Sequence, residues 1–258
     1  MGLPDGGLLT LLIGGSLVAG WIDAVVGGGG LVLIPLMLIV FPGIAPATAF
    51  GTNKVAAIWG TATAAALYLR KVTVDKRIVA ISVPVAGGFA AVGALAASAV
   101  SSDVMRPFVI VLMLGVGAFV VFRPQFGATT ESATPVGRGR FVVAIAMLAV
   151  IGFYDGVFGP GTGMFLIITL TALLHQNFLQ SAAMAKVANT ATNVGALIVF
   201  TSQGHVMWLL GAILAVANIA GSVLGSRLVL GRGTAVVRYA LLIVVIVMAI
   251  KLSIDQFA

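Results

Sequence analysis

The chain is a succession of long apolar runs separated by short polar connections. The pattern predicts ten apolar segments, which span residues 8–26, 31–41, 47–69, 78–100, 104–122, 141–158, 164–174, 179–200, 206–230 and 235–252. A helix that crosses a membrane needs about 20 residues, and most of these segments have roughly that length. The sequence therefore predicts an all-α polytopic membrane protein.

The second and seventh segments are too short to cross a membrane comfortably. Each follows a glycine-rich break, at residues 27–30 in the first case and 159–163 in the second. Short, glycine-interrupted segments at matching places in two halves of a chain point to the binding site of a transporter. We therefore expect two helices, broken by glycine, near the middle of the membrane.

The composition agrees with a membrane protein and excludes most other classes. Of the 258 residues, 60% are hydrophobic and 8% are charged, whereas an average soluble domain is about 25% charged. The chain has no cysteine, which excludes disulfides, zinc–thiolate sites and cysteine nucleophiles. No Ser/His/Asp set or pair of carboxylates can be brought together for catalysis. We expect no enzymatic activity, no cofactor and no bound metal.

An internal repeat relates the two halves of the chain. An offset of 132 residues superposes residues in pairs: Asp23 with Asp155, Lys54 with Lys186, Gly27 with Gly159 and Gly29 with Gly161. The chain has only seven acidic residues, so the aspartate and lysine matches carry the signal. The repeat predicts a first transmembrane unit over residues 1–122, a linker over 123–140 and a second transmembrane unit over 141–258.

The basic residues indicate how the chain crosses the membrane. They gather in three connections: Arg70, Lys71, Lys76 and Arg77; Arg123, Arg138 and Arg140; Arg227, Arg232 and Arg238. The positive-inside rule assigns such connections to the cytoplasm. Connections that correspond in the two units then face opposite sides, so we predict inverted repeats, a cytoplasmic linker and both termini outside. This topology explains the net charge of +7, and we expect no nucleic-acid partner.

Asp23 and Asp155 each lie within an apolar segment, just before a glycine break. A charged side chain at the centre of a bilayer costs about 2.5–3.5 kcal/mol on insertion scales, so a compensating role is required. One role is a proton-accepting site. The other is a cap for the broken helix, in which the carboxylate accepts hydrogen bonds from free backbone N–H groups. The two roles can coexist.

A candidate anion site combines both halves. Lys186, Asn189 and Asn193 share one helical face, and polar faces of membrane helices point into the bundle or a wet cavity. Lysine charge and amide donors suit an oxyanion, and backbone N–H groups after the glycine breaks would add donors. The predicted substrate-binding residues are Thr52, Asn53, Lys54, Lys186, Asn189, Asn193, Gly29 and Gly161.

Two other hypotheses concern the same lysines. Lys54 can pair with one of Asp23 and Asp155 and Lys186 with the other, in which case the pairs hold the repeats together. In the second hypothesis, the substrate and an aspartate compete for the same lysine, which would couple transport to protonation.

Two further features concern packing. Residues 221–225 have small residues at both ends, which predicts close helix packing within one chain or across a homodimer. His175 and His205 lie at segment ends, and we interpret both as interfacial residues near the outer face rather than as metal ligands.

Together these motifs resemble the TauE/SafE sulfite exporter family. The resemblance rests on residues 20–30 with Pro35, on 51–54 with 60–61, and on 152–163 with 185–186. It implies an inner-membrane transporter that exports sulfite or a small organosulfonate. In the second repeat, Met184-Ala185 replaces Thr52-Asn53, so we expect an asymmetric site.

The resulting prediction is a secondary transporter in the cell (inner) membrane. It would export a small sulfur-containing anion by alternating access around a site at the midplane, with proton coupling through Asp23 and Asp155. The alternatives are a passive anion channel and a transporter of another small solute.

Overall fold

A computed structural model describes residues 2–100, 104, 105, 111 and 137–232. Within these residues it contains eight helices: α1 (Gly6–Val26), α2 (Gly30–Val40), α3 (Pro46–Leu69), α4 (Lys76–Ala99), α6 (Arg138–Val157), α7 (Thr162–Leu174), α8 (Phe178–Ser202) and α9 (Trp208–Arg232). Each matches a predicted apolar segment to within a few residues. The predicted segment 235–252, nearly all of segment 104–122 and most of the linker lie outside the described residues.

Among the described residues, five helices are long and apolar enough to cross a membrane: α1, α4, α6, α8 and α9. The apolar helices α2 and α7 are shorter, with 11 and 13 residues. Helix α3 has 24 residues, but it carries a buried lysine, an asparagine and several threonines. The chain is therefore a multi-pass, all-helical membrane protein whose most polar long helices are also the most enclosed.

Polar side chains cap the starts of α1, α4 and α8. The Asp5 carboxylate accepts a hydrogen bond from the Leu8 N–H at 2.9 Å, and the Asp75 carboxylate accepts one from the Arg77 N–H at 2.8 Å. Asn177 and Gln180 form a capping box at the start of α8. Such caps satisfy N–H groups that have no partner within the helix.

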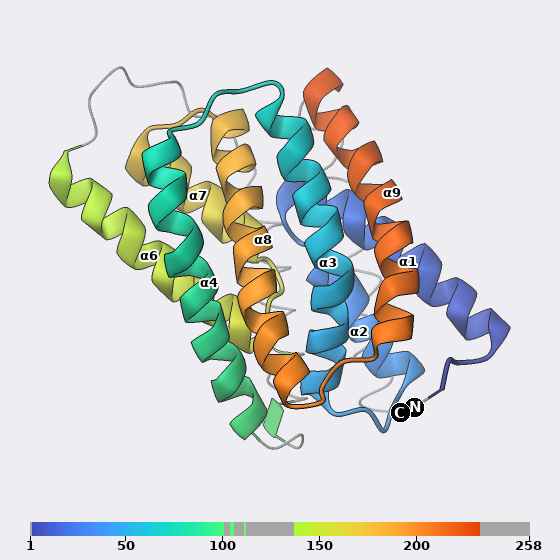
Figure 1. The fold of residues 1–258 in the computed structure, drawn as a ribbon. Coiled ribbons are helices and arrows are strands. Elements are labelled where there is room, and N and C mark those ends of the chain that lie inside the picture. The colour runs from blue at the N-terminus through green and yellow to red at the C-terminus, as the bar shows by residue number, and fades with distance from the viewer. Residues whose placement is uncertain (1, 101–103, 106–110, 112–136, 233–258) are drawn as a thin grey trace.

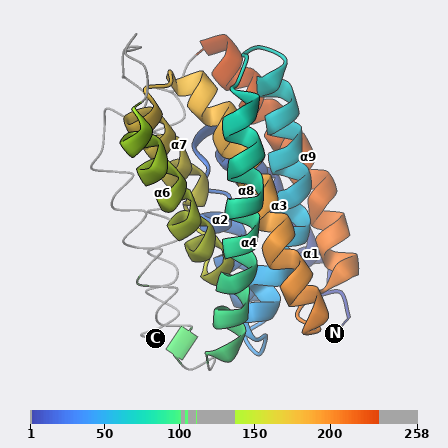
Figure 2. The ribbon, with the colours of Figure 1, turned by 60° about the vertical axis from the view of Figure 1, so that its left-hand side comes forward.

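The helices pack in a consistent order across the molecule. Helices α3 and α8 lie side by side in the centre, α4 packs on α8, and α9 packs on α3 (Figures 1 and 2). Outside these, α6 packs on α4 and α1 packs on α9. The short helices follow their breaks, so that α2 contacts α1 and α3, while α7 contacts α6 and α8. Each of these contacts therefore has a counterpart under the repeat: α1 on α9 corresponds to α6 on α4, and α3 on α9 corresponds to α8 on α4.

Close glycine contacts repeat under the same offset of 132 residues. A Cβ atom built on Gly20 would lie 2.1 Å from the carbonyl oxygen of Asn218. The corresponding residues are Gly152 and Ala86, where the distance would be 2.6 Å. In both places only glycine lets the two backbones approach so closely.

The predicted small-residue face of α9 is used within the chain. A Cβ atom built on Gly221 would lie 1.9 Å from the carbonyl oxygen of Leu17, and one on Gly225 would lie 2.5 Å from that of Trp21. This face packs against α1, which decides between the two alternatives for residues 221–225 in favour of packing inside the protomer.

Helices that correspond in the two halves run in opposite directions in Figure 1: α3 rises where α8 descends, and α4 descends where α9 rises. The C-terminal ends of α3 and α9 and the N-terminal ends of α4 and α6 all lie at the upper end. The sequence places basic residues at each of these ends. The described part of the chain therefore concentrates its basic residues at one end of the bundle.

The two histidines do not both lie near the outer face, because they are at opposite ends of the bundle. His175 contacts Arg140 at the N-terminal end of α6. The Nδ1 atom of His205 lies 3.1 Å from the hydroxyl of Thr48, near the start of α3. The histidines are separated because α7, which precedes His175, begins at the central glycine break and runs to one end of the bundle, whereas the full-length helix α8, which precedes His205, runs to the other.

Candidate substrate site

The two glycine breaks meet in the middle of the bundle. Gly27 ends α1 with φ of 85°, and Gly159 has φ of 90°, a left-handed backbone that favours glycine. The Gly163 N–H donates to the carbonyl oxygen of Gly27 at 3.1 Å. A Cβ atom on Gly27 would lie 2.4 Å from the Gly163 backbone. The two unwound segments are therefore in direct contact, one from each half.

Lys54 and Asp155 form a buried ion pair between the halves. The Lys54 Nζ lies 2.7 Å from Asp155 Oδ2, and both side chains are 2% exposed. The other carboxylate oxygen accepts a hydrogen bond from the Thr162 hydroxyl at 2.7 Å. Asp155 lies near the end of α6 and Thr162 begins α7, so their hydrogen bond links the two sides of the second break. The same carboxylate binds a lysine of the first half.

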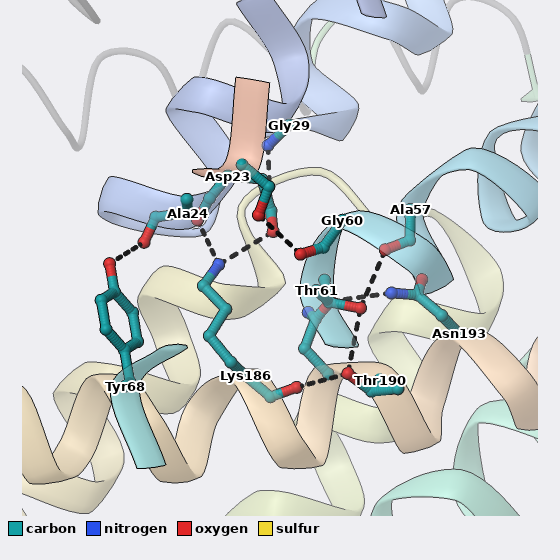
Figure 3. A network of polar contacts seen from close by, with 12 residues as sticks. Asp23, Ala24, Gly29, Ala57, Gly60, Thr61, Tyr68, Lys186, Thr190 and Asn193 are labelled. Carbon is teal, nitrogen blue, oxygen red and sulfur yellow. Dashed lines mark hydrogen bonds and ion pairs between the residues drawn. The ribbon is translucent and has the colours of Figure 1, made fainter. Parts of the chain in front are cut away.

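Lys186 and Asp23 form the reciprocal pair (Figure 3). The Lys186 Nζ lies 2.9 Å from Asp23 Oδ2 and also donates to the Asp23 backbone carbonyl. Asp23 Oδ1 accepts the Gly29 N–H at 3.4 Å. The Lys186 side chain is 0% exposed and the Asp23 side chain is 15% exposed. An aspartate of the first half thus holds a lysine of the second.

This geometry bears on the two roles considered for the aspartates. Asp23 accepts a backbone N–H across its break, as expected of a cap. Asp155 instead accepts a threonine hydroxyl, which the sequence reasoning did not anticipate. Both aspartates are paired with lysine, as the ion-pair hypothesis requires. The pairing balances four charges that would be costly to bury alone.

A chain of polar contacts continues from Lys186 between α3 and α8. The Thr190 hydroxyl lies 2.8 Å from the carbonyl oxygen of Lys186 and 3.0 Å from the Thr61 hydroxyl (Figure 3). One helical turn on, the Asn193 amide donates to Asn189 Oδ1 at 2.9 Å. The predicted polar face of α8 is therefore buried against α3, as the rule for polar membrane helices requires.

The remaining predicted site residues divide into two groups. Asn53 is buried beside Lys54, and Gly161, with φ of 79°, caps the start of α7. Thr52 lies apart from the ion pairs, because its hydroxyl accepts the Met207 N–H at 3.0 Å and so anchors the connection before α9.

Sequence reasoning missed two hydroxyl groups near the ion pairs. The first is Thr162, which binds Asp155; its counterpart in the first half is Gly30, so the repeat gave no signal. The second is Tyr68, whose hydroxyl donates to the carbonyl oxygen of Ala24 at 2.6 Å, next to Asp23. Among the described residues, no group of three His, Asp or Glu side chains could hold a metal ion.

The chain matches a known protein family and several curated proteins over nearly its whole length. Residues 12–252 match the family model described as sulfite exporter TauE/SafE. The chain is 35% identical to the "Probable membrane transporter protein ORF9" of a Sinorhizobium species, an alignment that covers 96% of this chain and 93% of the relative. It is 33% identical to the "Probable membrane transporter protein YfcA" of Escherichia coli K12, over 96% and 91% of the two chains.

A "Probable membrane transporter protein" of Haemophilus influenzae is also 33% identical, over 96% of both chains. No solved structure matches the chain significantly. The range matched by the family model includes the residues of both glycine breaks and both ion pairs. With a family match over nearly its whole length, the chain belongs to the TauE/SafE sulfite exporter family, whose members are membrane transporters and not enzymes.

Proposed function

We propose that the protein is a secondary transporter that exports a small sulfur-containing anion, such as sulfite or an organosulfonate. The observation that carries this proposal is the pair of buried lysines, each held by an aspartate of the other half beside a glycine break. Buried ionisable groups inside a membrane bundle typically mark a substrate or ion pathway. The family match supports sulfite as the first substrate to test.

The anion site would use Lys54 and Lys186 for charge and Asn53, Asn189 and Asn193 for directional hydrogen bonds. Each lysine already holds a carboxylate, which supports the proposal that these ammonium groups attract an oxyanion. A transported anion would compete with one of the two carboxylates. A proton taken up by the released aspartate would keep the buried charge balanced, which would couple export to protons.

The backbone donors of the breaks would join the site only when the breaks rearrange. In the present conformation the Gly29 N–H binds Asp23. The N–H groups of Thr162, Gly163 and Met164 bind backbone carbonyls. Opening the contact between the breaks would free the Gly163 N–H, which binds Gly27 across it, and a helix N-terminus attracts anions. During alternating access, a backbone N–H group of this kind would bind a protein carbonyl in one conformation and the anion in the other.

Inverted repeats and a cytoplasmic basic end complete the proposal. The reciprocal ion pairs, the repeated glycine contacts and the opposite directions of corresponding helices support inversion. The basic residues at one end of the bundle support a cytoplasmic assignment of that end.

The orientation can be tested with single cysteines, because the natural chain has none. Lys71→Cys and Gln203→Cys place a thiol in connections at opposite ends of the bundle. A membrane-impermeant maleimide applied to right-side-out membranes is expected to label only Gln203→Cys. In inverted membranes, only Lys71→Cys should react. Labelling of both from one side would contradict the topology.

Transport itself can be tested in proteoliposomes loaded with radiolabelled sulfite. The wild type is expected to release sulfite, and to move it against its gradient when a proton gradient is imposed. Lys54→Ala and Lys186→Ala are expected to abolish the flux in folded protein, whereas Lys71→Ala, which removes an exposed lysine, should retain it. Sulfite that moves only down its own concentration gradient, even when a proton gradient is imposed, would instead identify a passive channel. Wild-type flux from Lys186→Ala would refute the anion site.

A further inference from the structure

We propose that the two ion pairs have different roles. Lys54 and Asp155 form a permanent link between the halves, whereas Lys186 and Asp23 form the pair that opens to admit the anion. This inference rests on the proposed function, because it assigns one lysine of that site to the anion. The offset of 132 residues makes the two pairs equivalent in sequence, so the distinction comes from their surroundings in the structure.

The first difference is how tightly each aspartate is held. Asp155 has one oxygen on the Lys54 ammonium and the other on the Thr162 hydroxyl, both at 2.7 Å, and it is 2% exposed. Asp23 is 2.9 Å from Lys186, its other oxygen has a longer contact of 3.4 Å to the Gly29 N–H, and it is 15% exposed. Asp23 therefore loses less when it leaves its lysine, and it is the more exposed of the two aspartates.

The second difference lies on the helices that carry the lysines. The turn after Lys186 presents Asn189 and Thr190, and the corresponding residues after Lys54 are Ala57 and Ile58. Thr190 also contacts the Thr61 hydroxyl on α3. The turn that follows Lys186 is therefore polar and contacts α3, whereas the corresponding turn after Lys54 is apolar.

The exchange can be written with its charges balanced. The anion replaces the Asp23 carboxylate on the Lys186 ammonium, and the released carboxylate takes a proton from water. The buried site then holds one ammonium and one anion, as before. Release of the anion reverses both steps, so that one proton moves onto or off Asp23 for each anion that binds or leaves.

Few other titratable groups face Asp23. Lys186 approaches it from α8 and Tyr68 from α3, where the tyrosine hydroxyl binds the neighbouring Ala24 carbonyl. The packed helices α2 and α7 contain no ionisable side chain. Arg227 of α9 lies two residues beyond the contact of Gly225 with α1, but its side chain is exposed. Lys54, also on α3, is paired with Asp155. Among the described residues, the charged side chain in contact with Asp23 is therefore that of Lys186.

Two double variants test the assignment and avoid leaving a buried charge unpaired. Lys54→Gln/Asp155→Asn removes the pair proposed to be structural, and Lys186→Gln/Asp23→Asn removes the pair proposed to open. The measurement is the rise in melting temperature of the purified protein with increasing sulfite, because a ligand that binds the native state stabilises it. The second variant is expected to lose the sulfite response, whereas the first is expected to melt at a lower temperature and to respond more strongly to sulfite than the second.

The single variant Asp23→Asn gives a second readout. It leaves Lys186 without a competing carboxylate, so sulfite is expected to bind about tenfold more tightly or better. Its apparent affinity should change less with pH than that of the wild type, because only the ionisation of sulfite itself remains. Asp155→Asn, where it can be purified, is expected to melt at lower temperature and to keep the pH dependence of the wild type.

The outcomes separate this inference from the function on which it rests. A wild type that responds to sulfite, with equal losses in the two double variants, would overturn the division of roles and leave the anion site intact. Loss of the response only in Lys54→Gln/Asp155→Asn would reverse the assignment and so refute it. A wild type that responds to none of sulfite, sulfate and taurine would refute the proposed function, and this inference with it.

Discussion

The contact between the two glycine breaks makes a prediction that stability measurements can check. Gly27→Ala adds a methyl group at a backbone with φ of 85°, where it would lie 2.4 Å from the Gly163 backbone. The left-handed conformation costs a non-glycine residue about 1–2 kcal/mol. Forcing apart two packed backbones typically costs about a further 1–3 kcal/mol. We expect Gly27→Ala to pay both penalties.

Gly159→Ala is the matched control, because it isolates the backbone penalty. Its φ of 90° is nearly the same, but the nearest atom to an added Cβ would be the Lys54 Nζ at 3.3 Å. The end of a lysine side chain can shift by the few tenths of an ångström required. Gly14→Ala is the neutral control, since an added Cβ there has nothing within 4 Å.

The assay is the melting temperature of each purified variant in one detergent. With about 2–4 °C per kcal/mol for a chain of this size, Gly159→Ala should melt about 2–8 °C below the wild type and Gly27→Ala about 4–20 °C below it. Gly14→Ala should melt at or slightly above the wild type, because alanine favours a helix. Equal melting temperatures for Gly27→Ala and Gly159→Ala would refute the direct contact between the breaks.

Two further predictions follow from contacts outside the breaks. Gly221→Leu should separate α1 from α9, since even a Cβ there would lie 1.9 Å from the Leu17 carbonyl oxygen; a loss of melting temperature no larger than that of Leu224→Ala, at an exposed position of the same helix, would contradict this packing. Thr162→Val removes the hydroxyl donor to Asp155 and should cost about 1–3 kcal/mol, measured by thermal unfolding, whereas Thr162→Ser should restore most of the stability.

The helices could be predicted from the sequence because their limits follow from hydrophobicity alone. An apolar run inside a membrane forms a helix, since no water is present to satisfy free backbone groups. Helices α3 and α7 accordingly end at the predicted residue and begin one and two residues before the predicted start. The glycine breaks could be predicted for the same reason, because they interrupt the runs.

The pairing within the site could not be predicted to the same degree. The repeat makes Asp23 and Asp155 equivalent, so each lysine could pair within its own half or across the halves. The choice depends on how α3 and α8 pack between the breaks, which hydrophobicity does not specify. The contact of Gly27 with Gly163 was also missed, because the counterpart of Gly163 in the first half is Leu31 and the repeat therefore does not include it.

The reciprocal ion pairs have a consequence for how the protein is made. Lys54 enters the membrane 101 residues before Asp155 is synthesised, and Asp23 enters 163 residues before Lys186. At about 5–20 residues per second, the nascent first half carries two unneutralised charges for on the order of ten seconds. It must keep them at the lipid headgroups or inside the insertion machinery until the second half arrives. A ribosome that stops early therefore releases a fragment that quality-control proteases can recognise, and two halves synthesised as separate polypeptides should rescue each other from degradation.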